Sequence, residues 1–360
     1  ISGFDITTKK GLIALFSNKV ISASPKTIEE YTVTITLVNH NFDQNNNTGK
    51  NLSGKLIIQK DEYKVSLADY VISQYTGKQG ENNIYYHDSN LENGAGDNSY
   101  RYAGANPNNY VCFGSDEATC PHENLYRIIG LIDGKIKLIS ADVATTDMLG
   151  TDGGYYNTTS GAGWNSSHYK ESGDFTKIGL YKWNSTSTNT WSTSLFNKIN
   201  LNTNYLNNIG TTWSNLIEDT TWKVSGHTTD IVTPKAMFTA EITNATKTYG
   251  SENGTSKIGL MYVSDYGFAA APSAWTTPFY KYNSSAIKSV NWMYMGLDEW
   301  TITPNSLNSS SVFTFNSSGN LAYASVGNGY VVRPVLYLKA SIAYAGGSGT
   351  KDSPITLEVW

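Results

Sequence analysis

Residues 126–140 read YRIIGLIDGKIKLIS, with two apolar runs on either side of Asp133 and Gly134. An Asp-Gly pair between two such runs is typical of a two-residue β-hairpin turn, because both central residues of that turn need a positive φ. Residues 311–326 (SVFTFNSSGNLAYASV) repeat the arrangement around a Gly-containing turn. The chain is therefore expected to be built around antiparallel hairpins.

The segments around these hairpins predict further strands and a few helices. Residues 99–113 hold two short aromatic runs around a Pro-Asn turn, which predicts another hairpin. Apolar residues recur at helical spacing in three stretches, 65–77, 194–209 and 211–222. In the second stretch Leu195, Ile199 and Leu206 would share one face. The remaining apolar runs predict strands, at 258–271, 291–300 and 330–345. These patterns together predict an α+β fold.

The pattern of the chain changes near Asp61 and again near residue 95. Residues 1–62 contain alternating β-branched runs and predict a small all-β module, a stalk or half-sandwich. Residues 63–94 combine a helical pattern with a long polar loop and are interpreted as a connector. Residues 95–360 are expected to form one large ligand-binding domain.

The composition restricts the classes of partner. Charged residues make up only 16% of the chain and its net charge is −4, without any Lys/Arg-rich run. Nucleic acids and anionic membranes both require a basic surface, so neither is expected to be a partner. No stretch approaches the roughly 20 apolar residues of a membrane span, and we expect no direct membrane insertion. Whether a leader or anchor precedes Ile1 is left open.

The chain has two cysteines, Cys112 and Cys120, which flank a short loop. Their proximity predicts a local disulfide and an oxidising compartment, with a reduced pair as the alternative. A secreted protein or one displayed on a bacterial cell surface is the expected location. The surface rich in Asn, Ser, Thr and Tyr is in keeping with that location.

The order of motifs resembles a known fold. After the 126–140 hairpin come two helical stretches, then Glu299-Trp300-Thr301, a Gly-centred hairpin and Val332-Arg333-Pro334-Val335. This order resembles the C-type-lectin-like fold of formylglycine-generating-enzyme relatives and of the variable proteins of diversity-generating retroelements. Residues 98–121 are also similar to uncharacterised surface proteins of gut Firmicutes. The resemblance covers roughly residues 95–345.

The resemblance implies two structural expectations. The first and last strands of that fold pair, so 126–130 should lie beside 331–338. Arg333 should be buried and paired with a carboxylate or with backbone carbonyls, since a buried arginine needs a partner. Trp300 and Arg333 are therefore expected to be structural residues.

In the variable-protein branch the ligand surface lies between the Trp motif and the Arg-Pro motif. Here that segment is 301–330, and its alternation assigns Val312, Phe313, Phe315, Leu321 and Val326 to packing. The residues expected to point outward and bind a ligand are Pro304, Asn305, Leu307, Asn316, Tyr323, Ser325, Asn328 and Tyr330. Tyr, Asn and Ser are the residue types that antibody paratopes favour. The alternative is an ordinary polar loop in a chain rich in such residues.

Motifs of catalysis are missing from the sequence. No G-x-S-x-G elbow occurs, and His122 in the run PHEN lacks a second histidine at the spacing of a zinc site. The formylglycine-generating branch uses cysteines late in its domain, whereas this chain has none after Cys120. The resemblance therefore implies a binding protein rather than an enzyme.

No cofactor is expected. The calcium motifs of animal C-type lectins do not occur. A structural Ca²⁺ or Na⁺ has one candidate place, Asp147 and Asp152 beside a Gly-rich turn, although two loop aspartates are more often simply solvated.

Eight tryptophans between Trp164 and Trp300 are expected to lie mainly in the core. Trp275, between two prolines, is the exception that we expect at a carbohydrate-stacking surface.

The leading hypothesis is an adhesin or receptor-binding protein whose partner is a protein or glycan on a host, a phage or a neighbouring cell. One alternative is a pilin-like or matrix subunit that assembles by strand addition. Another is a phage receptor-binding protein.

Overall fold

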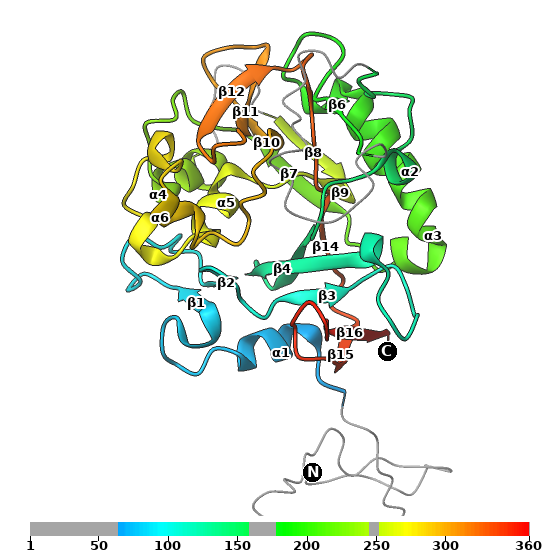
Figure 1. Ribbon diagram of the computed structural model, residues 1–360, viewed down its shortest axis with the longest axis vertical. Helices are drawn as coiled ribbons and strands as arrows, with labels where there is room; N and C mark the ends of the chain where they lie inside the picture. Colours follow the sequence, from blue (N-terminus) through cyan, green and yellow to red (C-terminus); the bar gives the residue numbers. More distant parts are fainter. Residues whose placement is uncertain (1–63, 158–177, 245–251, 360) are drawn as a thin grey trace, which may run out of the picture. The chain divides into compact units, whose positions relative to one another are not determined.

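The hairpin predicted around Asp133-Gly134 lies at the centre of the main sheet (Figure 1). Its strands are β4 (Leu125–Ile132) and β5 (Lys135–Ser140). The turn residues have φ values of 51° and 70°, the left-handed backbone that this turn type requires. This prediction is confirmed.

The computed structural model describes residues 64–157, 178–244 and 252–359. The chain divides into two compact units, Ile1–Lys64 and Val65–Trp360. The elements below all belong to the second unit, which includes most of the stretch interpreted as a connector, 63–94. The β-rich module predicted over 1–62 lies outside the described residues.

The main sheet is antiparallel, with the order β1-β2-β4-β5-β14-β9, and β3 also pairs with β4. Its other strands are β1 (Ile84–His87), β2 (Ser99–Tyr102), β3 (Tyr110–Cys112), β9 (Ile258–Gly259) and β14 (Val335–Tyr337).

Two predicted pairings are wrong. β2 and β3 do not form a hairpin with each other: both run antiparallel to β4 and follow one another along it. The chain between them is held against β4, where the Asn109 side chain donates to the carbonyl of Ile128 at 2.8 Å. Residues 126–130 also do not lie beside 331–338, because β5 lies between β4 and β14.

A second, three-stranded antiparallel sheet has the order β10-β11-β12 and is drawn near the upper end of Figure 1. Its strands are β10 (Glu299–Pro304), β11 (Ser311–Phe315) and β12 (Leu321–Ser325). The hairpin predicted over 311–326 is thus confirmed. The strand predicted over 291–300 begins only at Glu299, because residues 291–298 form turns.

In the described part of the chain, three two-stranded sheets accompany the two larger ones. The pairs are β6 (Tyr181–Lys182) with β13 (Gly329–Tyr330), β7 (Thr220–Val224) with β8 (Glu252–Ser256), and β15 (Ile342–Gly346) with β16 (Thr356–Val359).

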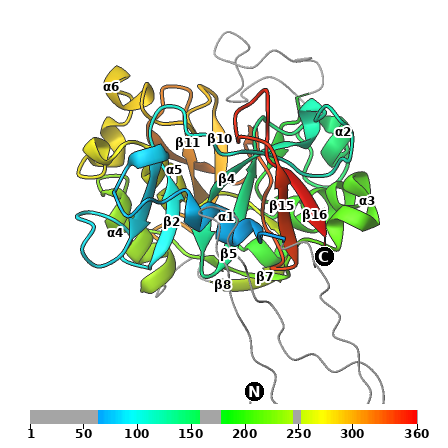
Figure 2. The same ribbon diagram turned by 90° about the horizontal axis from the view of Figure 1, so that it is seen from below.

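The predicted helix over 65–77 is α1 (Leu67–Ser73). The Ser66 hydroxyl accepts from the Asp69 amide at its N-terminus, and Leu67 and Val71 are buried. Tyr70 stacks on Tyr344 of β15 with ring centroids 4.0 Å apart, in the region that Figure 2 shows from below.

The other helical segments depart in part from the predictions. The stretch 194–209 is helical, with η7 (Phe196–Tyr205, a π-helix) leading into α3 (Leu206–Ser214). Its buried face is not the predicted one, since Leu195 is exposed whereas Phe196 and Leu201 are fully buried. The helix predicted over 211–222 ends at Ser214, and β7 starts at Thr220.

The apolar run 258–271, predicted as a strand, contains only the two residues of β9 before it becomes the helix α5 (Val263–Ala269). Carboxylates satisfy the first amides of this helix: Asp265 accepts from Tyr262, and Glu241 accepts from Val263 and Ser264. The partner Glu241 is distant in sequence, so the local pattern did not indicate it.

The remaining helices are short. They are α2 (Thr146–Leu149), α4 (Pro234–Phe238), η8 (Thr239–Thr243) and α6 (Ser285–Lys288), with 3₁₀ turns at Glu81–Asn83, His122–Asn124, Trp191–Thr193, Pro272–Ala274 and Phe279–Lys281. No helix in the described part of the chain is both long and apolar enough to cross a membrane. The fold class α+β is thus what the structure has.

The described tryptophans lie mainly in the core, as predicted, and Trp164 lies outside the described residues. Trp183, Trp191, Trp222 and Trp300 are each at most 1% exposed. Trp275, expected at a stacking surface, is also buried, and its indole donates to the Ala270 carbonyl at 2.9 Å. The buried position leaves none of its ring available to a ligand.

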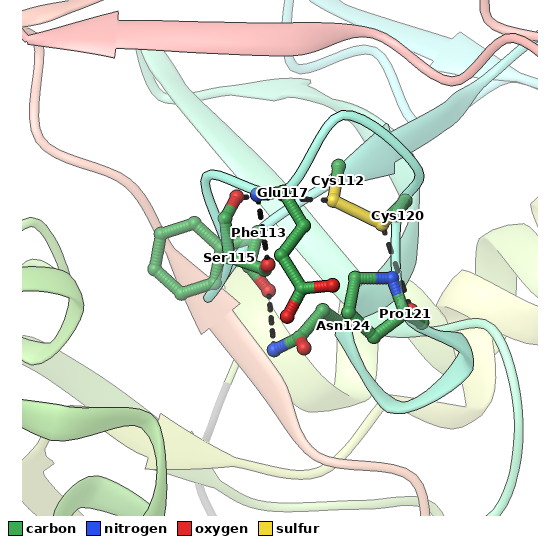
Figure 3. Close-up of a disulfide and its surroundings, with 7 residues drawn as sticks. All are labelled: Cys112, Phe113, Ser115, Glu117, Cys120, Pro121 and Asn124. Atoms are coloured by element: carbon green, nitrogen blue, oxygen red, sulfur yellow. Dashed lines mark hydrogen bonds between the residues drawn. A yellow bond between two sulfur atoms is a disulfide. The ribbon is translucent and has the colours of Figure 1, made fainter.

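The predicted disulfide joins Cys112 to Cys120 (Figure 3). It closes the loop that follows β3, next to the Asn124 side chain that donates to the Phe113 carbonyl at 3.3 Å. A disulfide fits an oxidising compartment.

Candidate functional site

The segment 301–330 is closed at its base by a buried ion pair. Arg333 donates from Nε and Nη2 to the two carboxylate oxygens of Glu299 at 2.7 and 2.9 Å, and from Nη2 to the Met293 carbonyl at 3.0 Å. Both side chains are at most 3% exposed. The predicted burial and pairing of Arg333 are confirmed. We call the Arg333–Glu299 pair the clamp.

Backbone contacts reinforce the clamp. The Trp300 amide donates to the Val331 carbonyl at 3.1 Å, and the Trp300 indole donates to the Tyr181 carbonyl at 2.7 Å. Burial raises the pKa of Glu299, whereas Arg333 lowers it. The two ends of the segment, at Trp300 and Val331, are therefore fixed together beside β10 of the second sheet.

Residues 305–311, between β10 and β11, form a braced loop. The Asn189 side chain is 2% exposed, and its Nδ2 donates to the carbonyls of Asn305, Asn308 and Ser311 at 3.4, 2.8 and 3.0 Å. Asn305 in turn accepts from the Leu307 amide at 2.9 Å. These bonds satisfy the loop's inner backbone groups, which fixes its conformation.

The braced loop presents Leu307 to solvent, with 67% of the side chain exposed. On the neighbouring edge strand β12, Tyr323 is 59% exposed, and Ser325 is also exposed. Ser325 pairs with Ser311, the last residue of the loop, so the strand and the loop adjoin. We call Leu307, Tyr323 and Ser325 the apical surface.

The packing residues predicted for this segment are correctly assigned. Each is at most 2% exposed: Val312, Phe313, Phe315, Leu321 and Val326. Phe315 stacks on Tyr266 of α5 with ring centroids 3.6 Å apart. The hairpin is thus anchored on the core from below.

The predicted outward residues divide into three groups. Leu307, Tyr323 and Ser325 are exposed as predicted. Pro304 and Asn305 are buried, which corrects their assignment: the first ends β10 and the second holds the loop.

Asn316 lies at the opposite end of the hairpin from the loop, where its side chain accepts from the amides of Ser318 and Asn320. It is half-buried and separate from the apical surface.

Asn328 and Tyr330 are half-buried and bonded to each other at 3.3 Å. The Tyr330 ring lies 4.6 Å from that of Trp300, and burial raises the pKa of its hydroxyl. Gly329 packs so closely on Tyr156 that an added Cβ would lie 2.3 Å from the ring. Asn328 and Tyr330 therefore support the base of the segment 301–330 and present little free surface to a ligand.

Sequence reasoning missed Asn189. Its neighbours, TSTNTW, read as an ordinary polar loop. Only the fold brings this loop against 305–311, with the Asn189 amide donating to the Ser309 carbonyl at 2.6 Å. No local signal distinguishes a bracing asparagine from a solvated one.

The place considered for a structural cation is a shallow, polar depression. It is lined by Asp147, Met148, Gly150, Thr151, Asp152, Asn204, Asn207 and Asn208. Asn204 donates to the Asp152 carboxylate at 2.7 Å, and Asn208 donates to the Asp147 carbonyl at 3.2 Å. Oxygen ligands of this kind suit Ca²⁺. Among the described residues, no group of three or more His, Cys, Asp or Glu side chains is placed to hold a metal ion.

His122 lies near the Asp142 carboxylate, with its Nε2 3.2 Å from Asp142 Oδ2. This geometry makes an ion pair when the imidazole is protonated.

The chain was compared with protein-family models, with curated proteins and with solved structures. Nothing matched. The assignment of function therefore depends on the residues and contacts described above.

Proposed function

We propose that this protein is an extracellular binding protein, an adhesin or receptor-binding protein, and that its apical surface contacts the ligand. In this proposal the protein binds its ligand and does not catalyse a reaction on it. It includes a C-type-lectin-like head, for which the α+β organisation and the closed segment 301–330 are the supporting features. The disulfide supports a location outside the cytoplasm.

One observation carries the proposal: a large tyrosine and a leucine are held outward on a rigid support. Tyr323 is 59% exposed on a hairpin whose inner residues are buried, and Leu307 is 67% exposed on a loop held by Asn189. A tyrosine fixed in this way supplies contact area with little loss of conformational entropy on binding. Binding residues are often found on loops that a rigid scaffold positions.

The ligand class that suits this surface is a protein or a glycan. A tyrosine ring can stack on a sugar face or fill a pocket on a protein, and Ser325 offers a hydroxyl beside it. An array of glycans and surface proteins, probed with the full chain, would identify which of the two classes binds.

The test compares two double variants on the array and in a titration with the ligand found. Leu307→Ala with Tyr323→Ala removes the exposed groups of the apical surface, and we expect a loss of roughly 30-fold or more in affinity, as for one hot spot of about 2 kcal/mol. Ile72→Ala with Val359→Ala is the matched control, because these side chains are 38% and 51% exposed. They belong to α1 and β16, drawn at the lower end of Figure 1.

The control variant should bind like the wild type. Binding that survives in the Leu307 and Tyr323 variant would refute the assignment of the apical surface. So would an equal loss in both variants. The free energy of unfolding of each variant should stay within about 1 kcal/mol of the wild-type value, because exposed side chains contribute little to stability.

A further inference from the structure

A row of residues crosses the main sheet in register: Arg101 of β2, Gly130 of β4, Lys137 of β5 and Tyr337 of β14. Residues in one such row project from the same face of a sheet. Gly130 has no side chain, and an added Cβ would lie 2.1 Å from the Tyr100 carbonyl oxygen. Two buried cations, Arg101 and Lys137, therefore share this face.

The carboxylate of Asp265, on α5, lies between the two cations. Its Oδ2 is 2.6 Å from the Lys137 Nζ, and its Oδ1 is 3.4 Å from Arg101. Arg101 has a closer partner in Asp97, at 2.7 Å. Lys137 is thus the nearest charged partner of Asp265.

A second carboxyl group, that of Glu241, lies near the same pair. It accepts from the first amides of α5, and Thr303 donates its hydroxyl to it. Glu241 raises the pKa of Lys137, and Asp265 raises the pKa of Glu241, so the three groups interact electrostatically.

The three groups are enclosed by protein. Lys137, Asp265 and Glu241 are at most 2% exposed. The Lys137 ammonium lies 4.5 Å from the ring centroid of Tyr262, 5.3 Å from that of Tyr337 and 5.8 Å from that of Trp222. Burial is the largest influence on both pKa values: it lowers that of Lys137, and it raises that of Glu241 to about 7. Both shifts favour the neutral forms, an amine and a carboxylic acid.

We propose that Lys137 and Asp265 react with each other to form an intramolecular amide bond, with Glu241 as the acid-base group. The observations that carry this are the contact of an amine with a carboxyl group, their burial away from water, and the second carboxyl beside them. Groups held in contact in a dry site react as if at effective concentrations of about 10⁵ M or more.

The reaction balances without any other reagent. The proton of the Lys137–Asp265 hydrogen bond passes from Nζ to the carboxyl group, and the lone pair of the neutral Nζ then attacks Cγ of Asp265, so that the Nζ–Cγ bond forms. Glu241, as a carboxylic acid, donates its proton to the departing hydroxyl and takes up the proton that Nζ loses. The Cγ–O bond breaks and one water molecule leaves, so the amine and the acid become an amide with no change in oxidation state.

Formation of the amide removes two buried charges, those of Lys137 and Asp265. Two cations and three carboxyl groups meet here, and isolated buried charges are costly. After the reaction, Arg101 keeps Asp97 as its partner, and neither Lys137 nor Asp265 carries a charge. The new bond would join β5 of the main sheet covalently to α5. A binding protein exposed to pulling forces would gain a link that unfolding alone cannot break.

The test is the intact mass of the purified, fully reduced wild-type chain. We expect it to be lower than the mass of the sequence by one water molecule, and peptide mapping should place the loss in a peptide pair that joins Lys137 to Asp265. A Glu241→Gln variant should show the full sequence mass or a slow loss of water, because its amide cannot transfer the proton.

The matched control is the pair Lys135 and Glu218, which is 2.9 Å apart but 41% and 30% exposed. It should show no cross-linked peptide, since water competes at that site. A wild-type chain at the full sequence mass would overturn the proposal, whatever the variants do. A water loss that maps to Asp133-Gly134, which can form a cyclic imide, would overturn it as well.

Discussion

Replacing Arg333 by methionine would remove the cation of the clamp and keep an unbranched apolar side chain in its place. Glu299 would then remain buried, at 2% exposure, without a positive partner. Breaking a buried pair from one side costs about 3–5 kcal/mol. The lost hydrogen bond to the Met293 carbonyl adds about 1 kcal/mol. Small domains are stable by roughly 5–15 kcal/mol, so this change consumes a large part of the total.

The loss of stability in Arg333→Met should depend on pH. Burial raises the pKa of Glu299 and Arg333 opposes that rise, so the variant should have a still higher pKa for this carboxyl. A raised pKa in the folded state contributes stability below the unfolded value, and that stability is lost as the pH rises. The deficit of Arg333→Met against the wild type should therefore be largest near pH 7 and shrink toward pH 4.

The assay is urea unfolding followed by tryptophan fluorescence at both pH values. The double variant Arg333→Met with Glu299→Leu should recover most of the loss, because no charge then remains buried. Lys135→Met is the control, since its pair with Glu218 is solvated and should contribute at most about 1 kcal/mol. A single variant within 1 kcal/mol of the wild type at pH 7 would refute the reasoning, as would a double variant no more stable than the single one.

Three further outcomes are expected. Replacing Cys112 and Cys120 by serine should lower the free energy of unfolding by about 2.5 kcal/mol, because the closed loop spans eight residues; a denaturant titration measures it. Asn189→Ala should cost about 1–3 kcal/mol by leaving buried carbonyls unpaired, and hydrogen exchange should increase across 305–311. Glu241 has a folded pKa of about 7 against an ordinary 4.5, so it should make the protein less stable as the pH rises from 4.5 to 7, by no more than about 3 kcal/mol; Glu241→Gln should flatten that slope.

Local patterns were sufficient where the chain itself determines the structure. The Asp133-Gly134 turn requires left-handed backbone at both residues, and it formed the expected hairpin. The helix over 65–77 has its own capping serine, Ser66, and the alternation in 311–326 identified the buried residues of the second hairpin. Arg333 was predictable because a buried arginine needs a carboxylate or carbonyl partner.

Sequence patterns gave wrong predictions where contacts with residues distant in sequence determine the structure. An apolar run such as 258–271 fits a buried strand or a buried helix equally well, and here Glu241 stabilises the helix from another segment. Pro304 and Asn305 read as surface residues, yet the sheet and Asn189 enclose them. Lys137 lay inside an apolar strand, KIKLIS, and a lysine in that position was an unused indication of a buried partner.

The clamp also changes what the chain can tolerate between its two ends. With Glu299 and Arg333 bonded, the segment between them starts and finishes at one fixed point. Lengthening a loop that is already closed costs only about 0.6 kcal/mol for each doubling of its length. Insertions near Leu307 would break the Asn189 bonds of the braced loop but leave the core intact, so foreign peptides inserted there would be displayed without unfolding the protein.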